Sequence, residues 1–143
     1  MLVGYLALTV AALFTGAAFY VNFAEQPARL GLEDRALLDE WKPAYKRGFA
    51  MQAPLAIVGF ILGGLAWWVS GRGAFLAGSI LMVANWPWTI FGIMPTNHRL
   101  DAIRSEDAGP HSRELVVWWN KLHAVRTVLG VLAIIAFLIA ACG

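Results

Sequence analysis

Residues Leu122–Cys142 read LHAVRTVLGVLAIIAFLIAAC, a stretch that is apolar almost throughout and holds one formally charged residue, Arg126. A helix needs about 20 such residues to cross the hydrocarbon core of a bilayer. Three more stretches of this kind precede it, over residues 2–24, 48–69 and 74–94. The sequence therefore predicts an all-α fold: an integral membrane bundle of four antiparallel helices, forming a single domain over residues 1–143.

The overall composition is also that of a membrane protein. Of the 143 residues, 59% are hydrophobic and 14% are charged, with a mean hydropathy of +0.64, outside the usual range for a soluble domain. The formal charge of +2 is not gathered into a basic stripe, so we expect no nucleic acid partner. The single cysteine, Cys142, excludes an internal disulfide and a cysteine-based metal cluster. The expected partners are the lipid bilayer and a lipophilic small molecule, and assembly as a homo-oligomer stays open.

The first connection, residues 25–47, carries five acidic and five basic residues and must lie outside the hydrocarbon. Asp34 is a suitable helix start, and Pro43 is expected to interrupt the helix that follows. Apolar residues recur between them at a spacing of three to four: Leu37, Leu38 and Trp41. We predict a short amphipathic helix that lies on the membrane surface or caps the bundle.

The other connections differ in length. Residues 70–73 form a tight turn, which makes the second and third spans antiparallel neighbours. Pro87 should bend the third span, because a proline removes one backbone hydrogen bond. Residues 95–113 should form a loop with a short helical piece, and the fourth helix should begin near Ser112.

The basic residues predict the orientation. Ten of the eleven Lys and Arg residues lie between Arg29 and Arg47 or between Arg99 and Arg126, which leaves Arg72 alone in the short turn. Because Lys and Arg favour the cytoplasmic side, we place both long loops in the cytoplasm. The expected location is a bacterial inner membrane, with the two termini on the opposite side.

The polar residues of the spans gather toward one end of such a bundle. An up-and-down arrangement would bring together Asn22, Glu25, Tyr45, Gln52, Asn85, Asn97, Trp119, His123 and Arg126. Amide, phenol, carboxylate and imidazole groups can orient a small polar molecule, and an indole can stack on a flat ring. The sequence therefore predicts a substrate pocket at the cytoplasmic end.

Two residues of this group have open interpretations. Arg126 lies inside an apolar span, which is unfavourable unless the side chain reaches the interface, pairs with an anion or lines a wet cavity. Its partner could be Glu25, a substrate anion or both, whereas Glu25 could also be a solvated charge at a helix end. His123 lies three residues before Arg126 on the same helix face and could be a packing residue or an acid-base group.

Four short segments together resemble a known family. They are NFAEQP at residues 22–27, YKRGFAMQAP at 45–54, MPTNHRL at 94–100 and WNKLHAVRT at 119–127. These segments resemble the small four-helix membrane proteins of the anthrone oxygenase-like family over nearly the whole chain. The resemblance implies oxidation of an anthrone to an anthraquinone by molecular oxygen, without a conventional flavin or haem.

The resemblance also implies roles for individual residues. His123 becomes the candidate base that removes a proton from an activated carbon, and Arg126 the group that stabilises the resulting enolate. Glu25, together with Asn97 and Gln52, would orient the substrate or the base. No cofactor is predicted.

Three functions remain to be compared. The leading interpretation is a membrane oxidoreductase or oxygenase that acts on a lipophilic aromatic or quinone-like molecule. The first alternative is a non-enzymatic module for small-molecule binding, transport or assembly. The second is a metal-dependent membrane enzyme, with the metal on His123, Glu25 and a further ligand, although no metal-binding motif is present.

Overall fold

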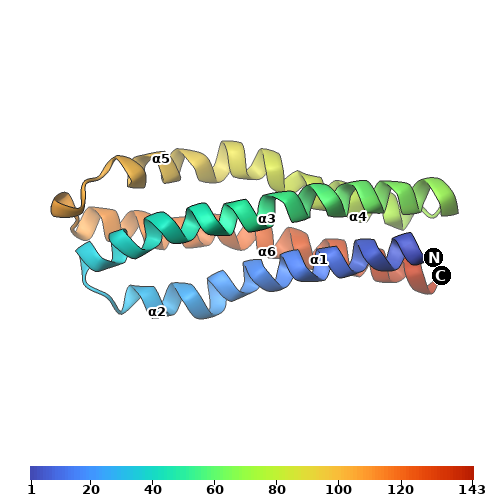
Figure 1. Cartoon of the computed structure of the whole chain (residues 1–143), viewed down its shortest axis with the longest axis horizontal. Coiled ribbons are helices and arrows are strands. Elements are labelled where there is room, and N and C mark those ends of the chain that lie inside the picture. The colour runs from blue at the N-terminus through green and yellow to red at the C-terminus, as the bar shows by residue number, and fades with distance from the viewer.

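The computed structural model describes residues 1–143 and consists of four long antiparallel rods (Figure 1). The first and third rods combine more than one helical segment, and only residues 31–33, 71–72 and 103–109 separate one rod from the next. The segments are α1 (Leu2–Tyr20), the π-helical turn η1 (Val21–Glu25), α2 (Gln26–Leu30), α3 (Asp34–Ser70), α4 (Gly73–Trp88), the π-helical turn η2 (Thr89–Ile93), α5 (Met94–Ala102), the 3-10 turn η3 (Ser105–Asp107) and α6 (Pro110–Cys142). The prediction of an all-α four-helix bundle is confirmed.

Each rod packs on two neighbours. α1 lies against α3 and α6, and α4 lies against the same two helices from the other side. The two termini lie together at one end of the bundle (Figure 1). The tight turn between α3 and α4 forms as predicted, and Gly71 ends α3 with a φ of +71°, a left-handed conformation that glycine adopts without strain.

Small residues fill the apolar core near the termini. Phe137 of α6 lies directly against Gly63 and Gly78, where a Cβ atom would overlap its ring. The rest of this core is largely alanine: Ala7, Ala11, Ala56, Ala66, Ala133 and Ala140. Small residues let helix backbones approach closely, which is how helices associate within a bilayer. This half of the bundle is therefore tightly packed.

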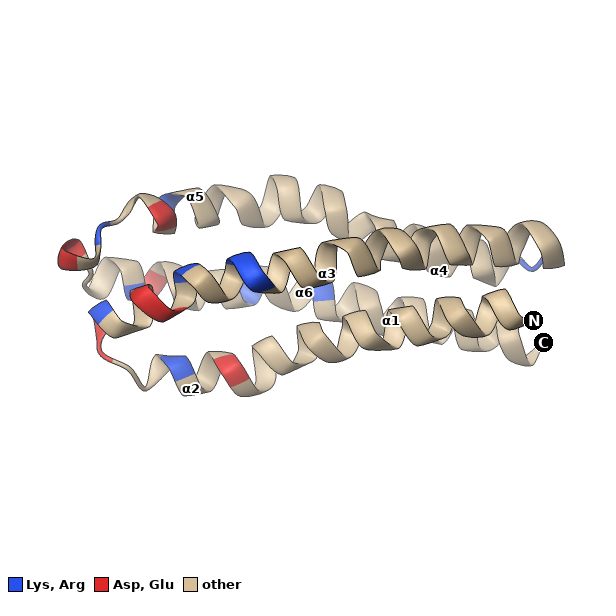
Figure 2. Cartoon of the chain, in the orientation of Figure 1, with Lys and Arg blue, Asp and Glu red and all other residues tan.

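The four rods are integral to a membrane. Each is long and apolar enough to cross a bilayer, with a mean hydropathy of 1.4 to 2.5 over its most apolar window. Large apolar side chains cover the outside, for example Leu13, Ile61, Val131, Ile135 and Ile139. Charged residues gather at the end opposite the termini (Figure 2). Such a distribution fits a protein whose charged end lies outside the hydrocarbon.

The first connection differs from the prediction. The expected interruption at Pro43 does not occur, because α3 runs unbroken from Asp34 through Pro43 to Ser70. Pro43 is exposed, and so is Asp39, whose carbonyl loses its usual hydrogen bond, so water can satisfy that carbonyl. The expected amphipathic residues form the first turns of α3 and are buried inside the end of the bundle: Leu37, Leu38 and Trp41.

The second long connection is also more helical than expected. α4 passes through Pro87 to Trp88 and continues as the π-helical turn η2. α5 then covers residues 95–102 of the predicted loop, with Pro95 in its first turn, where the missing N–H of a proline does no harm. α6 begins at Pro110, two residues before the predicted start.

Candidate functional site

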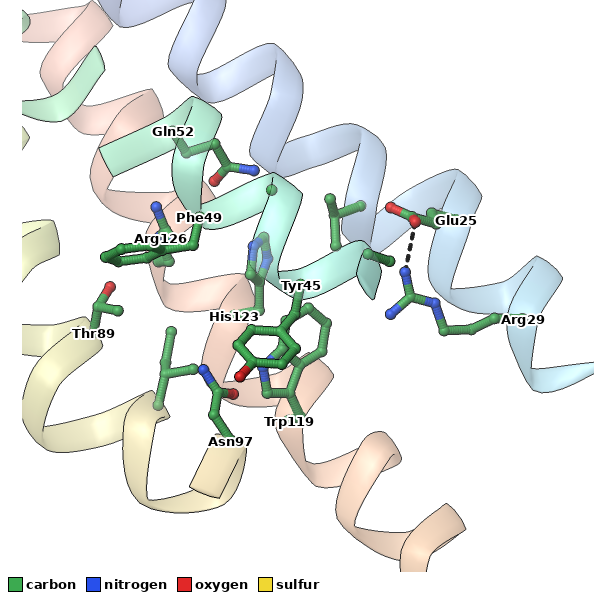
Figure 3. A pocket seen from close by; sticks show the side chains of 14 residues that line it. Glu25, Arg29, Tyr45, Phe49, Gln52, Thr89, Asn97, Trp119, His123 and Arg126 are labelled. Atoms are coloured by element: carbon green, nitrogen blue, oxygen red, sulfur yellow. Dashed lines mark ion pairs between the residues drawn. The ribbon is translucent and has the colours of Figure 1, made fainter. Parts of the chain in front are cut away.

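A narrow pocket lies among all four rods toward the charged end of the bundle (Figure 3). Fourteen residues line it, and they come from η1, α2, α3, η2, α5 and α6. The interior of about 30 Å³ has room for about two waters, because one water needs roughly 10–15 Å³. The pocket can hold the polar end of a ligand, but not a whole ring system without movement of its walls.

Both π-helical turns contribute to the walls of this pocket. Val21 and Glu25 come from η1, and Thr89 and Ile93 come from η2. A π-helical turn holds an additional residue and redirects the side chains around it, and such turns are frequent at functional sites. The two local departures from α-helical geometry thus coincide with the pocket.

Arg126 is the most unusual residue of the site. Its side chain is buried, with the residue only 5% exposed, and no carboxylate forms an ion pair with it. Its Nε atom has no hydrogen-bond partner, and the guanidinium lies over the ring of Phe14 at 5.4 Å. A buried, unpaired cation is strongly unfavourable, so Arg126 is suited to accept an anionic group of a ligand.

Asn22 fixes the position of the His123 ring by a hydrogen bond to Nδ1. The Asn22 Oδ1 atom lies 3.1 Å from His123 Nδ1 and accepts a hydrogen bond of 2.8 Å from the Thr127 hydroxyl. The amide nitrogen of Asn22 donates to the side chain and the backbone carbonyl of Asn120, at 2.6 and 3.0 Å. We predicted that Asn22 binds substrate, but it does not line the pocket because these four bonds occupy its amide.

The Asn22 amide also determines which nitrogen of neutral His123 carries the proton. The backbone carbonyl of Asn120 can only accept, so the Asn22 group beside it must be the NH₂. The Asn22 oxygen then faces Nδ1, and Nδ1 must donate to it. The lone pair of His123 is therefore on Nε2, which bonds to no other protein group and belongs to a residue that lines the pocket.

Of the open alternatives for Arg126, an ion pair with Glu25 does not form. Glu25 binds Arg29 at 2.7 Å, an interaction drawn in Figure 3, because residues four apart share one face of a helix. The Arg29 Nε atom is 3.0 Å from a carboxylate oxygen of Glu40, an ion pair without hydrogen-bond alignment. Arg29 is buried and also lies over the Trp119 ring at 5.8 Å. Two acids therefore neutralise Arg29 and leave Arg126 unpaired.

A line of aromatic rings closes one side of the pocket. Tyr45 stacks on Trp41 at 4.3 Å, Trp41 meets Trp119 edge to face at 5.7 Å, and Trp119 lies 4.9 Å from the His123 ring. The Tyr45 hydroxyl donates to Asp101, so this phenol is already engaged. Trp119 lines the pocket with an unpaired Nε1, as a stacking surface for a ligand would.

The predicted amides fall into two places. Gln52 and Asn97 are buried in the pocket wall, and each has a side-chain oxygen without a hydrogen-bond partner. Asn85 lies in a smaller adjoining cavity that also contacts Arg126, and its NH₂ donates to the carbonyls of its own helix at 3.2 and 3.3 Å. Unpaired buried polar atoms call for a ligand or water. Gln52 and Asn97 thus add acceptors to the cationic pocket.

Comparison with known proteins identifies the family of this chain. The family model described as anthrone oxygenase matches residues 41–136, about two thirds of the chain. The chain belongs to the anthrone oxygenase family. It is 28% identical over 137 aligned positions to an anthrone oxygenase of Claviceps purpurea (strain 20.1), covering 86% of this chain and 79% of that protein. No solved structure matches this chain. The family resemblance predicted from the sequence is confirmed, and it indicates an oxygenase-type function.

The region matched by the anthrone oxygenase family contains most of the pocket. It includes the unpaired cation Arg126, the base candidate His123 and the ring of Trp119, together with Gln52 and Asn97. The residues of η1 and α2 lie before it. The family match therefore covers three of the four rods that surround the site.

Sequence reasoning missed several residues of this pocket. Arg29 was counted as a loop charge, although its spacing of four from Glu25 was a signal that could have identified the pair. Phe49 and Thr89 line the pocket without any distinctive pattern in the sequence. No group of three His, Cys, Asp or Glu side chains is placed to hold a metal, and His98 and His111 are exposed. His123 and Glu25 therefore lack the third ligand that the metal hypothesis required.

Proposed function

We propose that this protein is a membrane oxygenase that oxidises a lipophilic aromatic or quinone-like molecule at a carbon activated by a conjugated carbonyl. The observation that carries the proposal is the unpaired buried guanidinium of Arg126 in the same pocket as His123, whose Nε2 lone pair is free. A base beside a fixed cation is the arrangement needed to form and hold an enolate.

The reaction needs one oxygen molecule for each substrate molecule. Nε2 of His123 takes a proton from the activated CH₂ group, and the negative charge delocalises onto the carbonyl oxygen beside Arg126. The electron-rich anion transfers one electron to O₂, the two radicals combine at the carbon, and the peroxide anion takes the proton from His123. His123 then removes the remaining C–H proton, the O–O bond breaks, and the departing hydroxide leaves as water. The CH₂ group becomes a second carbonyl.

The other residues of the site have supporting roles in this proposal. Gln52 and Asn97 hold the substrate by polar contacts, and Trp119 packs against the part of the substrate that enters the pocket. Glu25, which we predicted to be catalytic, neutralises Arg29 together with Glu40. An acid that is bound in this way does not compete with the substrate anion for Arg126. The substrate is therefore the anion that satisfies the site.

Oxygen consumption tests the proposal directly. Purified protein in lipid nanodiscs should consume one O₂ per anthrone and produce the corresponding quinone, measured with an oxygen electrode and by absorbance. Nanodiscs without protein give the spontaneous oxidation rate to subtract, and a parallel sample with a chelator tests for a metal requirement. Saturable binding of anthrone and related phenols and quinols without oxygen consumption would instead support a non-enzymatic binding module.

We further propose that the charged end of the bundle lies in the cytoplasm of a bacterial cell, with the protein in the inner membrane. This proposal is supported by the gathering of Lys and Arg at that end (Figure 2). A periplasmic alkaline phosphatase fused after Gly143 should then be active, and a green fluorescent protein at the same position should be dark. The opposite pair of results would reverse the orientation.

A further inference from the structure

A second, larger hollow lies on the outside of the bundle, between α1 with η1 and α3. Its volume is about 420 Å³, and it is open to the surroundings of the protein. Tyr20 and Met51 on its walls are 60% and 53% exposed, and both belong to helices that cross the membrane. Arg47 contributes the one basic side chain. The hollow is therefore an open groove at the level where the apolar spans meet the charged end of the bundle.

The groove and the polar pocket share part of their walls. Val21 and Glu25 on one side, and Ala44 and Gly48 on the other, line both. Ala44 and Gly48 are four residues apart on one face of α3, so the wall opposite η1 consists of the two smallest side-chain types. The boundary between the groove and the pocket is therefore thin at this point.

We propose that this groove is the entrance through which the substrate passes from the bilayer to His123, and that the apolar part of the bound substrate stays in it. The inference rests on the proposed function and adds the route by which the substrate enters and the place where its rings bind. The pocket is too small for fused rings, whereas the groove has the volume and the apolar walls that rings require. A molecule dissolved in lipid would reach the groove without crossing water.

Gly48 gives a direct way to test the entrance. A Cβ atom built on Gly48 has no neighbour within 4 Å, so a side chain can leave the α3 backbone there without a clash at its first atom. Gly16 is a matched control, because its Cβ position is equally open and it is exposed on α1 without lining the groove. Phenylalanine at position 48 would fill the passage, whereas phenylalanine at position 16 would only extend into lipid.

The experiment measures anthrone binding in nanodiscs under argon, so that no oxidation occurs. Trp119 lines the pocket, and the part of the tryptophan quenching that Trp119→Phe abolishes reports arrival there. Gly48→Phe should slow this quenching by about tenfold or more, because a blocked approach lowers the association rate. Gly16→Phe should bind at the rate of the unmodified protein.

The outcomes separate the entrance from the chemistry. Unchanged binding kinetics in Gly48→Phe would overturn the entrance, and so would the absence of any Trp119-dependent binding in the unmodified protein. Binding that is slowed in Gly48→Phe, in a protein that consumes no oxygen, would support the entrance and overturn the oxygenase proposal.

Discussion

Replacing His123 with alanine is expected to lower the rate of oxygen consumption with anthrone by about 10²- to 10⁴-fold, the usual contribution of a general base. The free lone pair on Nε2 is the proton acceptor of the proposed reaction, and no other side chain of the pocket has a comparable unpaired basic nitrogen. The measurement is turnover in nanodiscs, with helix content and thermal unfolding recorded for the same samples.

Asn22→Ala provides an informative companion variant. It leaves the imidazole in place but removes the acceptor that keeps the proton on Nδ1, so it should reduce turnover less than His123→Ala does. It should also change the pH profile of turnover, which a purely structural loss would not do. If folded His123→Ala protein kept full turnover, His123 would not be the base.

Arg126→Met is expected to lower turnover strongly without weakening the fold. Removing an electrostatic partner of a developing oxyanion lowers the rate by about 10²- to 10³-fold. Replacement of an unpaired buried cation by an apolar side chain of similar length should leave the thermal unfolding temperature unchanged or raise it. Arg126→Lys should also lose activity, because an ammonium lacks the planar fork that holds an enolate at two points.

Arg72 supplies the control for this experiment. It lies in the turn at the far end, where its guanidinium donates to the Ala140 carbonyl at 2.7 Å, and Arg72→Met should not alter turnover. Lower stability of Arg126→Met combined with unchanged turnover would show that Arg126 is a structural residue and would contradict its assigned role.

The fold could be predicted from the sequence because lipid imposes a simple rule. A span must be apolar over about 20 residues, and that requirement identified the four rods from the sequence. The short gap between the second and third apolar stretches then identified the turn at Gly71. The boundaries near the charged end were less predictable. Pro43 and Pro95 are usual signals of a helix end, but an exposed carbonyl and a first-turn position let helices include them.

The site could be predicted only in part. The polar residues at one end of the spans were recognisable, and His123, Arg126, Gln52, Asn97 and Trp119 do line one pocket. Which side chain faces which partner depends on the rotation of each helix, and a sequence does not give that rotation directly. Asn22 therefore hydrogen-bonds to Nδ1 of His123 and does not line the pocket, and Glu25 pairs with Arg29 on the same rod.

The π-helical turn η1 lets the first rod direct one set of residues to the apolar core and another set to the pocket, which a regular α-helix could not do at the same time. One additional residue rotates everything beyond it by about 100° relative to an uninterrupted α-helix. The amino-terminal part of the rod can thus keep Ala7 and Ala11 in the tightly packed core while Glu25 and Arg29 face the pocket. Deleting one residue from η1 would keep the rod helical but force one of these two faces out of alignment, so the length of this turn matters as much as its residues.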